Sequence, residues 1–208
     1  FLDHRLFFPA TQRNKKYIGD VLSKIPLTKG SILEIGSGSG EHGIEFQKRF
    51  PEITWQTSDP ELAHRKSISS WIDYEELNMK MPQPLDIDVV RTPWYIPLEL
   101  ALFIQGIIAI NMIHITPWKC TESLFKESGK LLKNGQFLML YGPFKICNEF
   151  TSQSNFLFDK SLKTQNSLWG LRDLEEVSSL GSENGFLQED IIKMPANNFA
   201  LIYRKVCQ

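Results

Sequence analysis

An acid and three alternate glycines follow a short apolar segment in this chain, which reads Ser-Ile-Leu-Glu-Ile-Gly-Ser-Gly-Ser-Gly over residues 31–40. Gly36, Gly38 and Gly40 let the backbone adopt positive φ angles and approach a ligand closely, as a nucleotide-cofactor loop requires. Residue 41 is glutamate, so the third glycine comes one position too early for the Gly-x-Gly-x-x-Gly pattern of dinucleotide-binding loops. This spacing disfavours NAD.

Acidic residues flank the loop, with Glu34 before it and Glu41 after it. A pyrophosphate suits a helix N-terminus without acids, whereas acids suit a cationic ligand. Here the chain resembles the class I S-adenosylmethionine-dependent methyltransferases, whose first motif reads acid-x-Gly-x-Gly-x-Gly. The resemblance implies that S-adenosyl-L-methionine is the cofactor and S-adenosyl-L-homocysteine the product, bound by Glu34, Gly36, Ser37, Gly38 and Gly40.

Hydrophobic periodicity and turn residues predict the elements that position this loop. We expect helices over residues 11–25, 40–50 and 61–74, a helix that starts at Thr116-Pro117 and runs to 133, and a last helix opened by a capping box of Asp173 and Glu176. Strands are expected over residues 31–35, 53–58, 85–89, 106–110, 137–141, 189–194 and 199–205, and residues 142–171 read as irregular.

The last two expected strands are separated by only four residues, which predicts an antiparallel hairpin after a parallel α/β sheet. Class I methyltransferases end in this way. We therefore expect a Rossmann-like α/β fold in a single domain over 1–208, with a seven-stranded, mostly parallel sheet, an antiparallel C-terminal hairpin and helices on both faces.

Residues just after the strands are candidates for the site, because ligands of open α/β sheets bind beyond the carboxyl ends of the strands. Asp59 ends the second expected strand and could accept hydrogen bonds from ribose hydroxyls, or it could cap the next helix. Asp88 ends the third, where the methyltransferase pattern places an acid on the adenine amino group. Asp86 competes for that role, and either could be a solvated turn residue.

Asn111 ends the fourth expected strand and begins the run Asn-Met-Ile-His. The Asn/Asp-Pro-Pro-aromatic pattern of nucleic-acid amino-methylating enzymes is absent, which disfavours a nucleobase target. His114 could be a general base, since an unperturbed imidazole pKa of about 6.5 suits proton removal at neutral pH. It could equally order a loop through hydrogen bonds. Tyr141 is the second candidate base, and His42 reads as a cofactor-contact or cap residue.

The resemblance narrows to the DUF938 family, the methyltransferase-like 26 group. The motifs that carry it are Arg13-Asn14-Lys15, residues 34–42, residues 111–115, Tyr-Gly-Pro-Phe at 141–144, Ser-Asn-x-x-Phe-Asp at 154–159 and Trp-Gly-Leu-Arg-Asp at 169–173. One departure is Cys147-Asn148, where an Asn-Gly turn is expected. The family is assigned to S-adenosylmethionine-dependent methyl transfer from its fold and motif, and it implies no particular substrate.

The segment 144–169 comes after the fifth expected strand, and its aromatic residues are set in polar sequence. We expect it to fold over the cofactor as a substrate cover. Phe144, Trp169 and Arg172 are therefore candidates for substrate binding, although Arg172 could be an ordinary ion-pair partner. Arg13 and Asn14 could reach the methionine end of the cofactor or only start a helix. We assign Asn14 to the cofactor and Arg13 to the substrate.

Composition limits the class of function. A net charge of -1 over 208 residues indicates neither nucleic acid nor an anionic membrane, and the apolar run over 98–115 is too polar to span a bilayer. Three separated cysteines predict reduced thiols in the cytoplasm, with no disulfide framework and no metal site. Because the chain opens on Phe1, we expect a few native residues to precede it.

We therefore expect transfer of a methyl group from S-adenosylmethionine to a small molecule by direct in-line displacement. The alternative is a noncatalytic S-adenosylmethionine-binding or scaffolding protein. A nicotinamide oxidoreductase ranks third, because Glu41 and the closing hairpin argue against it.

Overall fold

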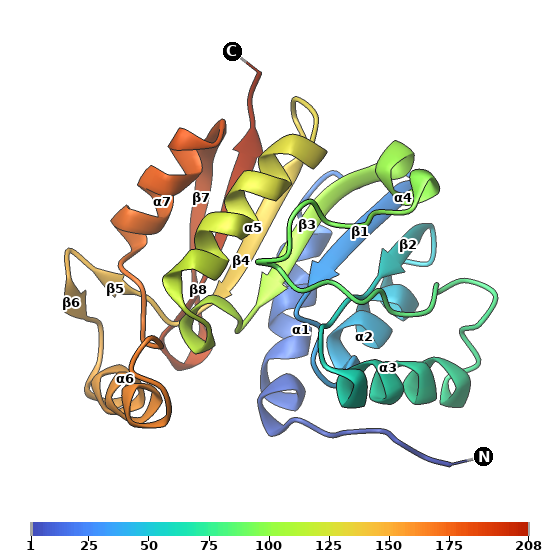
Figure 1. Cartoon of the computed structure of the whole chain (residues 1–208), viewed down its shortest axis with the longest axis horizontal. Coiled ribbons are helices and arrows are strands. Elements are labelled where there is room, and N and C mark those ends of the chain that lie inside the picture. Colours follow the sequence, from blue (N-terminus) through green and yellow to red (C-terminus); the bar gives the residue numbers. More distant parts are fainter. Residues whose placement is uncertain (1, 208) are drawn as a thin grey trace. The chain divides into compact units, whose positions relative to one another are not determined.

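A computed structural model describes residues 2–207, and the chain divides into two compact units, 1–108 and 109–208 (Figure 1). The first unit contains α1 (Pro9–Ser23), β1 (Gly30–Ile35), α2 (Glu41–Arg49), β2 (Ile53–Gln56), α3 (Leu62–Tyr74) and α4 (Leu98–Phe103). β3 (Ile104–Ile110) runs across the boundary. The second unit contains η1 (Ile113–Ile115), α5 (Trp118–Leu131), β4 (Phe137–Gly142), β5 (Lys145–Ile146), β6 (Glu149–Phe150), α6 (Gln153–Gln165), α7 (Leu174–Glu183), β7 (Phe186–Met194), η2 (Pro195–Asn197) and β8 (Asn198–Lys205).

The main sheet has the strand order β2-β1-β3-β4-β8-β7, and β5 and β6 form a separate two-stranded sheet. β1 and β2 are parallel, with Gly30 opposite Ile53. β8 is antiparallel to both β4 and β7. The expected α/β class, mostly parallel with an antiparallel C-terminal hairpin, is confirmed. The main sheet has six strands, however, and the expected seven is wrong.

The missing strand is the one expected over residues 85–89. Within this stretch, Leu85 alone pairs, in an isolated parallel bridge with Ser58. Its backbone N–H donates to Thr57 O at 3.0 Å and its carbonyl accepts from Asp59 N at 3.0 Å. Asp86 and Asp88 interrupt the rest of the stretch, because aspartate has a low strand propensity. Their side chains turn instead to Arg65 and Arg91, at 3.3 and 3.6 Å.

The loss of that strand makes β2 an edge strand, and a side chain from α2 occupies part of its edge. Gln47 Nε2 donates to Ile53 O at 2.7 Å, and Trp55 N donates to Gln47 Oε1 at 2.9 Å. One amide thereby binds two backbone groups on the edge that would otherwise face a neighbouring strand. The edge is closed to pairing with another chain at this point.

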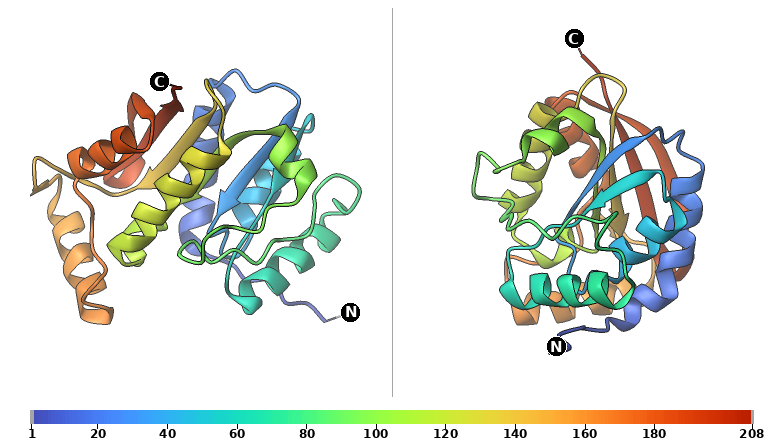
Figure 2. Two further views of the ribbon diagram at one scale, coloured as in Figure 1. Left: turned by 45° about the horizontal axis from the view of Figure 1, so that its top comes forward. Right: turned by 90° about the vertical axis from the view of Figure 1, so that its right-hand side faces the viewer.

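The first unit places helices on both faces of its strands. In the right panel of Figure 2, α1 and α2 lie on one face of β1 and β2, while residues 76–97 and α4 lie on the other. The core here includes Phe46 and Trp55, whose ring centroids lie 5.0 Å apart. Ile68 from α3 packs against Gly40, where a Cβ would come within 2.7 Å of the Ile68 side chain.

The second unit packs α5 and α7 against one face of β4, β8 and β7 (Figure 1). Phe125 of α5 contacts Tyr203 and Phe186, with ring centroids 5.3 and 5.8 Å apart. β4 is buried along its whole length. The helix expected to start at Thr116-Pro117 begins at Trp118, with Pro117 as its N-cap. The Thr116 hydroxyl does not cap α5 but donates to Met112 O at 3.1 Å and closes η1.

Residues 142–171 are not irregular. They contain β5, β6 and α6, and Ser152 caps α6 by accepting from Asn155 N at 3.1 Å. Cys147 and Asn148 have φ angles of 51° and 61° and join β5 to β6. Positive φ at both central positions is the geometry that an Asn-Gly turn provides. The β5–β6 hairpin therefore forms although Cys147-Asn148 stands where the family pattern has Asn-Gly.

We expect Gln47→Ala to lower the free energy of unfolding by about 1–3 kcal/mol, because Ile53 O and Trp55 N would be left at a buried edge without partners. Urea denaturation followed by circular dichroism measures the change. Gln165→Ala, in an exposed position of α6, is the matched control and should have little effect. Equal stability of the two variants would contradict the role given to Gln47.

Candidate functional site

The glycine loop connects β1 to α2 in the first unit. Gly36, Gly38 and Gly40 have φ angles of 68°, 56° and 91°, so all three adopt the left-handed conformation that glycine allows. A Cβ at Gly38 would lie 3.0 Å from Phe8 Cε2. Gly38 therefore makes room for an aromatic ring of the chain itself. Nothing in the spacing of residues 2–8 had indicated that Phe8 reaches this loop.

Asp59, at 4 % exposed, lies beside the glycine loop and accepts three hydrogen bonds. Gly38 N donates to Oδ2 at 2.8 Å, while Glu61 N and His64 Nδ1 lie 2.9 and 3.0 Å from Oδ1. The contact with Glu61 N fixes the turn before α3, but Glu61 is the N-cap of that helix and no side chain caps it, so the alternative that Asp59 caps the helix is wrong. One lone-pair position on Oδ2 is left for a further donor.

Ser37 and Ser58 fasten the loop to the chain after β2. Ser37 N donates to Ser58 O at 2.8 Å, and Ser58 N donates to Ser37 Oγ at 3.0 Å. Ser58 Oγ donates to the carbonyl of Glu34 at 2.6 Å. Ser37 thus has a structural role in the loop, whatever else it contacts.

Glu34 is a buried carboxyl group at 1 % exposed. Burial, with a smaller contribution from the neighbouring Asp59 carboxylate, raises the pKa of Glu34 to about 7, against hydrogen bonds that lower it and include one from Trp55 Nε1 at 3.4 Å. No ion pair with Lys, Arg or His is formed by Glu34 within residues 2–207. An acid in this position has the chemistry to receive a cationic group.

Glu41, in contrast, is fully engaged by its own chain. Its Oε1 accepts from Phe8 N at 2.6 Å and from Ser39 Oγ at 2.8 Å, and its Oε2 accepts from Gln12 Nε2 at 2.8 Å. The sequence suggested that Glu41 favours a cationic ligand. Its contacts instead assign it to holding the N-terminal residues against the loop.

His42 and Asn14 contact each other, with His42 Nε2 2.6 Å from Asn14 Oδ1. Burial, together with the charge of Lys15, lowers the pKa of His42 to about 3, so the imidazole is neutral at physiological pH. Because the amide oxygen only accepts, Nε2 carries the ring proton. The pair joins α1 to α2. Arg13, the neighbouring residue, is exposed.

Asp88 lies in the loop that replaces the expected third strand. Its Oδ1 accepts from Val90 N at 3.2 Å and its Oδ2 lies 3.6 Å from Arg91 Nε. Asp86 is more exposed, with 67 % of its side chain accessible against 34 % for Asp88, and it pairs with Arg65. Both therefore have turn or surface contacts, and Asp88 is the less solvated of the two.

In the second unit, His114 and Asn111 lie at Gly142, the last residue of β4. A Cβ at Gly142 would come within 3.2 Å of His114 Nδ1 and 3.4 Å of Asn111 Oδ1. Asn111 has a φ of 51°, and its N–H donates to Tyr141 O at 2.8 Å. Asn111 and His114 are thus brought together at the carboxyl end of β4, whereas Tyr141 contacts Asn111 there only through its backbone carbonyl.

His114 is 3 % exposed, and its Nδ1 is a buried nitrogen without a hydrogen-bond partner among residues 2–207. Burial, with a further contribution from Arg172, lowers the pKa of His114 to about 4. The imidazole is thus neutral at physiological pH. Phe158 from α6 covers it, with ring centroids 5.7 Å apart in an edge-on arrangement.

Arg172 binds backbone carbonyls and is not an ordinary ion-pair residue. Its Nε donates to Ile113 O at 3.3 Å, and its Nη2 donates to Thr116 O at 2.7 Å and Leu168 O at 2.9 Å. It therefore fixes the chain around η1 and the chain before Trp169. Phe144 is buried at 1 % exposed, and Trp169 is half-buried.

Two other motif residues hold α6 in place. Asn155 Nδ2 donates to Asn197 O at 3.2 Å, and Asp159 Oδ1 accepts from Leu171 N at 2.8 Å. Asp173 caps α7 by accepting from Glu175 N and also accepts from Asn148 N, which confirms its expected capping role. The family motifs of this unit thus build the segment 144–173.

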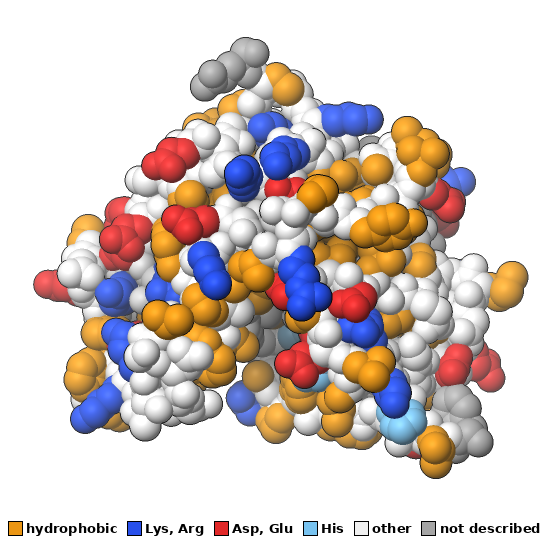
Figure 3. All heavy atoms as spheres, viewed as in Figure 1, with side chains coloured by type: hydrophobic (Ala, Val, Ile, Leu, Met, Phe, Trp, Pro, Cys, Tyr) orange, Lys and Arg blue, Asp and Glu red, His pale blue; other side chains and the backbone are white. Residues whose placement is uncertain are grey.

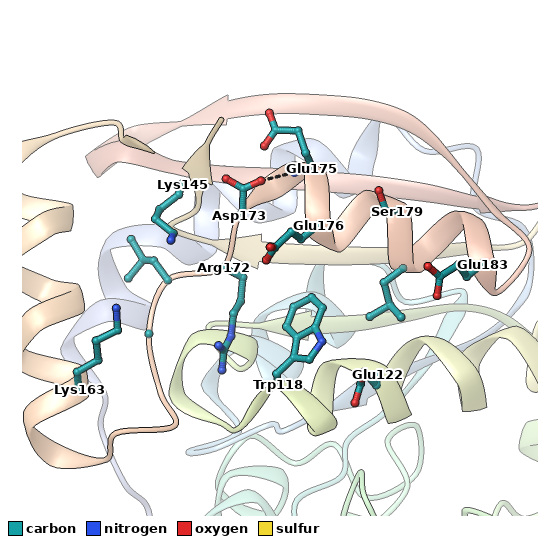
Figure 4. A pocket seen from close by; sticks show the side chains of 13 residues that line it. Trp118, Glu122, Lys145, Lys163, Arg172, Asp173, Glu175, Glu176, Ser179 and Glu183 are labelled. Atoms are coloured by element: carbon teal, nitrogen blue, oxygen red, sulfur yellow. Dashed lines mark hydrogen bonds between the residues drawn. The ribbon is translucent and has the colours of Figure 1, made fainter. Parts of the chain in front are cut away.

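An open groove of about 730 Å³ lies between α5, α7 and the chain at 170–173 (Figure 4). Trp118, Glu122 and Arg172 line it from one side, and Figure 3 shows acidic side chains gathered over α7. Its cations already have partners, with Lys163 2.8 Å from Asp159 and Lys145 3.0 Å from Asn148. Such a polar lining is unlike an apolar small-molecule pocket.

A second cavity, of about 780 Å³, lies in the first unit and is lined by Gly30 and Ser31 at the start of β1 together with Leu85, Leu100 and Phe103. It extends from the amino end of β1 along β2 to Gln56, and no residue of the glycine loop lines it. Ligands of open α/β sheets bind at the carboxyl ends. Within residues 2–207 no group of His, Cys, Asp and Glu has the arrangement of a metal site, and no helix is long and apolar enough to cross a membrane.

The fold is that of known methyltransferases. The pyocyanin biosynthetic protein PhzM is 14% identical with a TM-score of 0.75, over 95% of this chain and 56% of that chain. An O-methyltransferase family protein from Burkholderia thailandensis is 13% identical with a TM-score of 0.76, over 95% and 57%. Human N-acetylserotonin methyltransferase, solved with S-adenosylmethionine, is 15% identical with a TM-score of 0.74, over 95% and 53%.

This chain spans somewhat more than half the length of each of those proteins. The likeness shows a Rossmann-like fold of the methyltransferase class, as the glycine loop and closing hairpin led us to expect. A family model described as a protein of unknown function, DUF938, matches residues 5–205. The chain belongs to the DUF938 family.

We expect Glu34→Gln to stabilise the protein at high pH. The carboxyl titrates near 4.5 when unfolded and near 7 when folded, so between these values the native state retains a proton that the unfolded state has lost. The stability that this group contributes therefore falls as pH rises through that window. The variant should gain up to about 3 kcal/mol relative to wild type between pH 4.5 and pH 8.

Urea denaturation at the two pH values measures this gain. Glu52→Gln, at an exposed position, is the control and should have the same small effect on stability at both pH values. A gain for Glu34→Gln that does not depend on pH would argue against a buried, protonated Glu34.

Proposed function

We propose that this chain, a member of the DUF938 family in its methyltransferase-like 26 group, transfers a methyl group from S-adenosylmethionine to a small-molecule acceptor. The observation that carries the proposal is the contact of Asp59 with Gly38 N, at 2.8 Å, beside a buried Glu34 that has no cationic partner among the described residues. Asp59, which can accept hydrogen bonds from hydroxyls, and Glu34, which can bind a cation, therefore lie at the same glycine loop. Solved proteins of this fold include one in complex with S-adenosylmethionine and one, PigF, with S-adenosylhomocysteine.

The side chains and backbone groups at the loop fit this cofactor. We assign Glu34 to its ammonium group, Asp59 to a ribose hydroxyl, and Asp88 to the adenine amino group. Gly36, Ser37, Gly38 and Gly40 supply the close backbone, and Asn14, His42 and Asn111 complete the cofactor set. The pair of Asn14 and His42 acts by fixing α1 on α2, since the two side chains already bind each other.

S-adenosylmethionine, when bound, supplies an electrophilic methyl group attached to a sulfonium. The neutral thioether that remains after transfer is a good leaving group and needs no protonation by the protein. The protein has to orient the acceptor in line and exclude water, and such orientation can provide about 7–11 kcal/mol. His114 is our first candidate for the general base that removes a proton from the methyl acceptor, and Tyr141 is the second. A neutral imidazole of pKa about 4 is a weak base, and Arg172 opposes its protonation. His114 therefore takes a proton only as the attacking atom becomes acidic during bond formation.

We assign the segment 144–169 to covering the acceptor within a single 1–208 methyltransferase domain. Phe156 and Leu157 on α6 are 42 % and 55 % exposed, which offers apolar surface for an organic acceptor. Phe144, Trp169, Arg172 and Arg13 remain the assigned substrate residues, and Arg172 acts through the backbone that it fixes. We place the protein in the cytoplasm and expect no nucleic-acid partner.

The alternative is a noncatalytic S-adenosylmethionine-binding or scaffolding protein. It would keep Glu34, Asp59 and Asp88 but would not need a neutral, buried imidazole at the end of β4. The unpartnered Nδ1 of His114 favours the enzyme, because leaving a buried polar atom without a partner is unfavourable unless it is used.

We expect S-adenosylhomocysteine to bind with one site per chain in isothermal titration calorimetry. Asp59→Ala should weaken binding by about 1–3 kcal/mol, because a ribose hydroxyl would lose its charged acceptor. Asp86→Ala, with its carboxylate largely exposed, is the matched control and should bind as wild type does. Circular dichroism confirms that both variants are folded. Binding of NAD with no response to S-adenosylhomocysteine would overturn the cofactor assignment.

We expect residues 144–169 to exchange backbone hydrogens more slowly when S-adenosylhomocysteine and a methyl acceptor are both present. The reason is that a segment that covers the methyl acceptor makes additional contacts with it. Exchange mass spectrometry would use a phenol, a thiol and an amine as test acceptors. Asp159→Asn should raise exchange in α6 without ligand, since the latch to Leu171 N weakens. Lys160→Ala, exposed on the same helix, is its control. Equal protection in every ligand state would favour the noncatalytic alternative.

A further inference from the structure

The residues that precede α1 run along α3 and are attached to it by specific polar contacts. His4 N donates to Ser70 Oγ at 3.2 Å, and Leu6 N donates to Ser67 Oγ at 2.9 Å. Trp71 Nε1 donates back to Leu6 O at 3.1 Å. Alternate backbone groups of this extended stretch are thus paired with side chains of one helix. We refer to residues 3–8 as the strap.

A cation held on aromatic rings anchors the strap near its start. The guanidinium of Arg5 lies 3.6 Å from the ring centroid of Tyr74 and 4.9 Å from that of Trp71, and its Nη2 lies 2.9 Å from Asp3 Oδ2. These contacts are near the surface and are individually weak. They position the strap without locking it.

The far end of the strap is attached to the glycine loop. Phe8 N donates to Glu41 Oε1 at 2.6 Å, and the same oxygen accepts from Ser39 Oγ. Ser67, which accepts from the strap, donates to Ser39 O at 2.7 Å. Glu41 and Ser67 therefore couple the position of the strap to the conformation of the loop between Gly38 and Gly40.

Phe8 occupies a specific position over that loop. Its ring packs against Gly38, where a Cβ would come within 3.0 Å of Phe8 Cε2, and it meets His64 edge-on at 5.8 Å between centroids. His64 in turn contacts Asp59. The ring of Phe8, a residue that is 38 % exposed, thus packs on the loop at Gly38 and on His64, which contacts the acid that we assign to the ribose.

The strap is only partly buried. Its residues Asp3, His4, Arg5 and Leu6, together with Leu62, Ala63 and Lys66 of α3, line an open cavity of about 490 Å³. Phe7 remains 62 % exposed. The side chains of the strap are exposed or half-buried, and segments with little buried side-chain surface open at low free energy, so the strap can move while the rest of the unit stays folded.

We propose that the strap completes the cofactor site: Phe8 forms a wall over Gly38 beside Asp59, and Glu41 holds that wall closed. This inference rests on the proposed function, because it takes the glycine loop as the cofactor site. The cofactor then enters and leaves by displacement of residues 3–8, and Phe8 retains it once the strap has closed. Phe8 is a binding residue, and Glu41 positions it.

The test is the dissociation rate of S-adenosylhomocysteine from the full chain, measured by stopped-flow displacement. Phe8→Ala should raise the rate about tenfold, and Phe8→Tyr, which retains the ring, should stay close to wild type. Glu41→Gln should raise it less, because one acceptor oxygen remains for Phe8 N. Tyr17→Ala, an exposed aromatic residue on α1, is the matched control and should leave the rate unchanged.

Hydrogen exchange at the amides of His4, Leu6 and Phe8 provides a second measurement, and it should slow when the ligand binds. If wild type binds the ligand while Phe8→Ala leaves both the rate and the exchange unchanged, the strap proposal is wrong and the proposed function stands. If wild type shows no binding of S-adenosylhomocysteine, both are overturned.

Discussion

The contact between Asp59 and Gly38 N is the interaction on which the candidate cofactor site depends. It joins two points 21 residues apart, the end of the β2 segment and the middle of a loop whose three glycines all have positive φ. A loop of this kind has many accessible conformations, since glycine is unrestricted. The carboxylate selects one of them, and through Glu61 N and His64 it also fixes the start of α3. Loop, strand and helix are thereby set by one buried charge.

That charge has an energetic consequence for its neighbour. Asp59 helps to raise the pKa of Glu34, so the two acids at one loop cannot both ionise without destabilising the empty protein. A cationic ligand would relieve this repulsion, and part of its binding free energy would be spent on removing the proton from Glu34. Stability of the unliganded protein and affinity for a cation therefore oppose each other at the same side chain.

Sequence reasoning located the parts of the fold that depend on local pattern. The glycine loop, the β1-α2-β2 unit, the closing hairpin and the cap at Asp173 all result from periodicity and turn chemistry over a few residues. It failed where the local structure depends on a residue that is distant in the sequence. The strand expected at 85–89 is replaced by the amide of Gln47, and the segment 142–171 acquires a helix through latches to Asn197 and Leu171. Phe8 was missed because no local signal relates it to Gly38, and Glu41 was misinterpreted because its partners lie in residues 8 and 12.

The same distinction separates two kinds of motif residue in this chain. Asn155, Asp159, Arg172 and Asp173 direct their polar atoms mainly at backbone groups of other segments. Such contacts specify where the chain passes and tolerate changes in the side chains between them, because a backbone acceptor or donor is present whatever residue carries it. Phe156 and Leu157, which lie between the anchors and remain exposed, are free of that constraint. Within α6, the residues that fix its position are thus different from those that can vary with an acceptor, so the helix can keep one placement while its exposed surface changes.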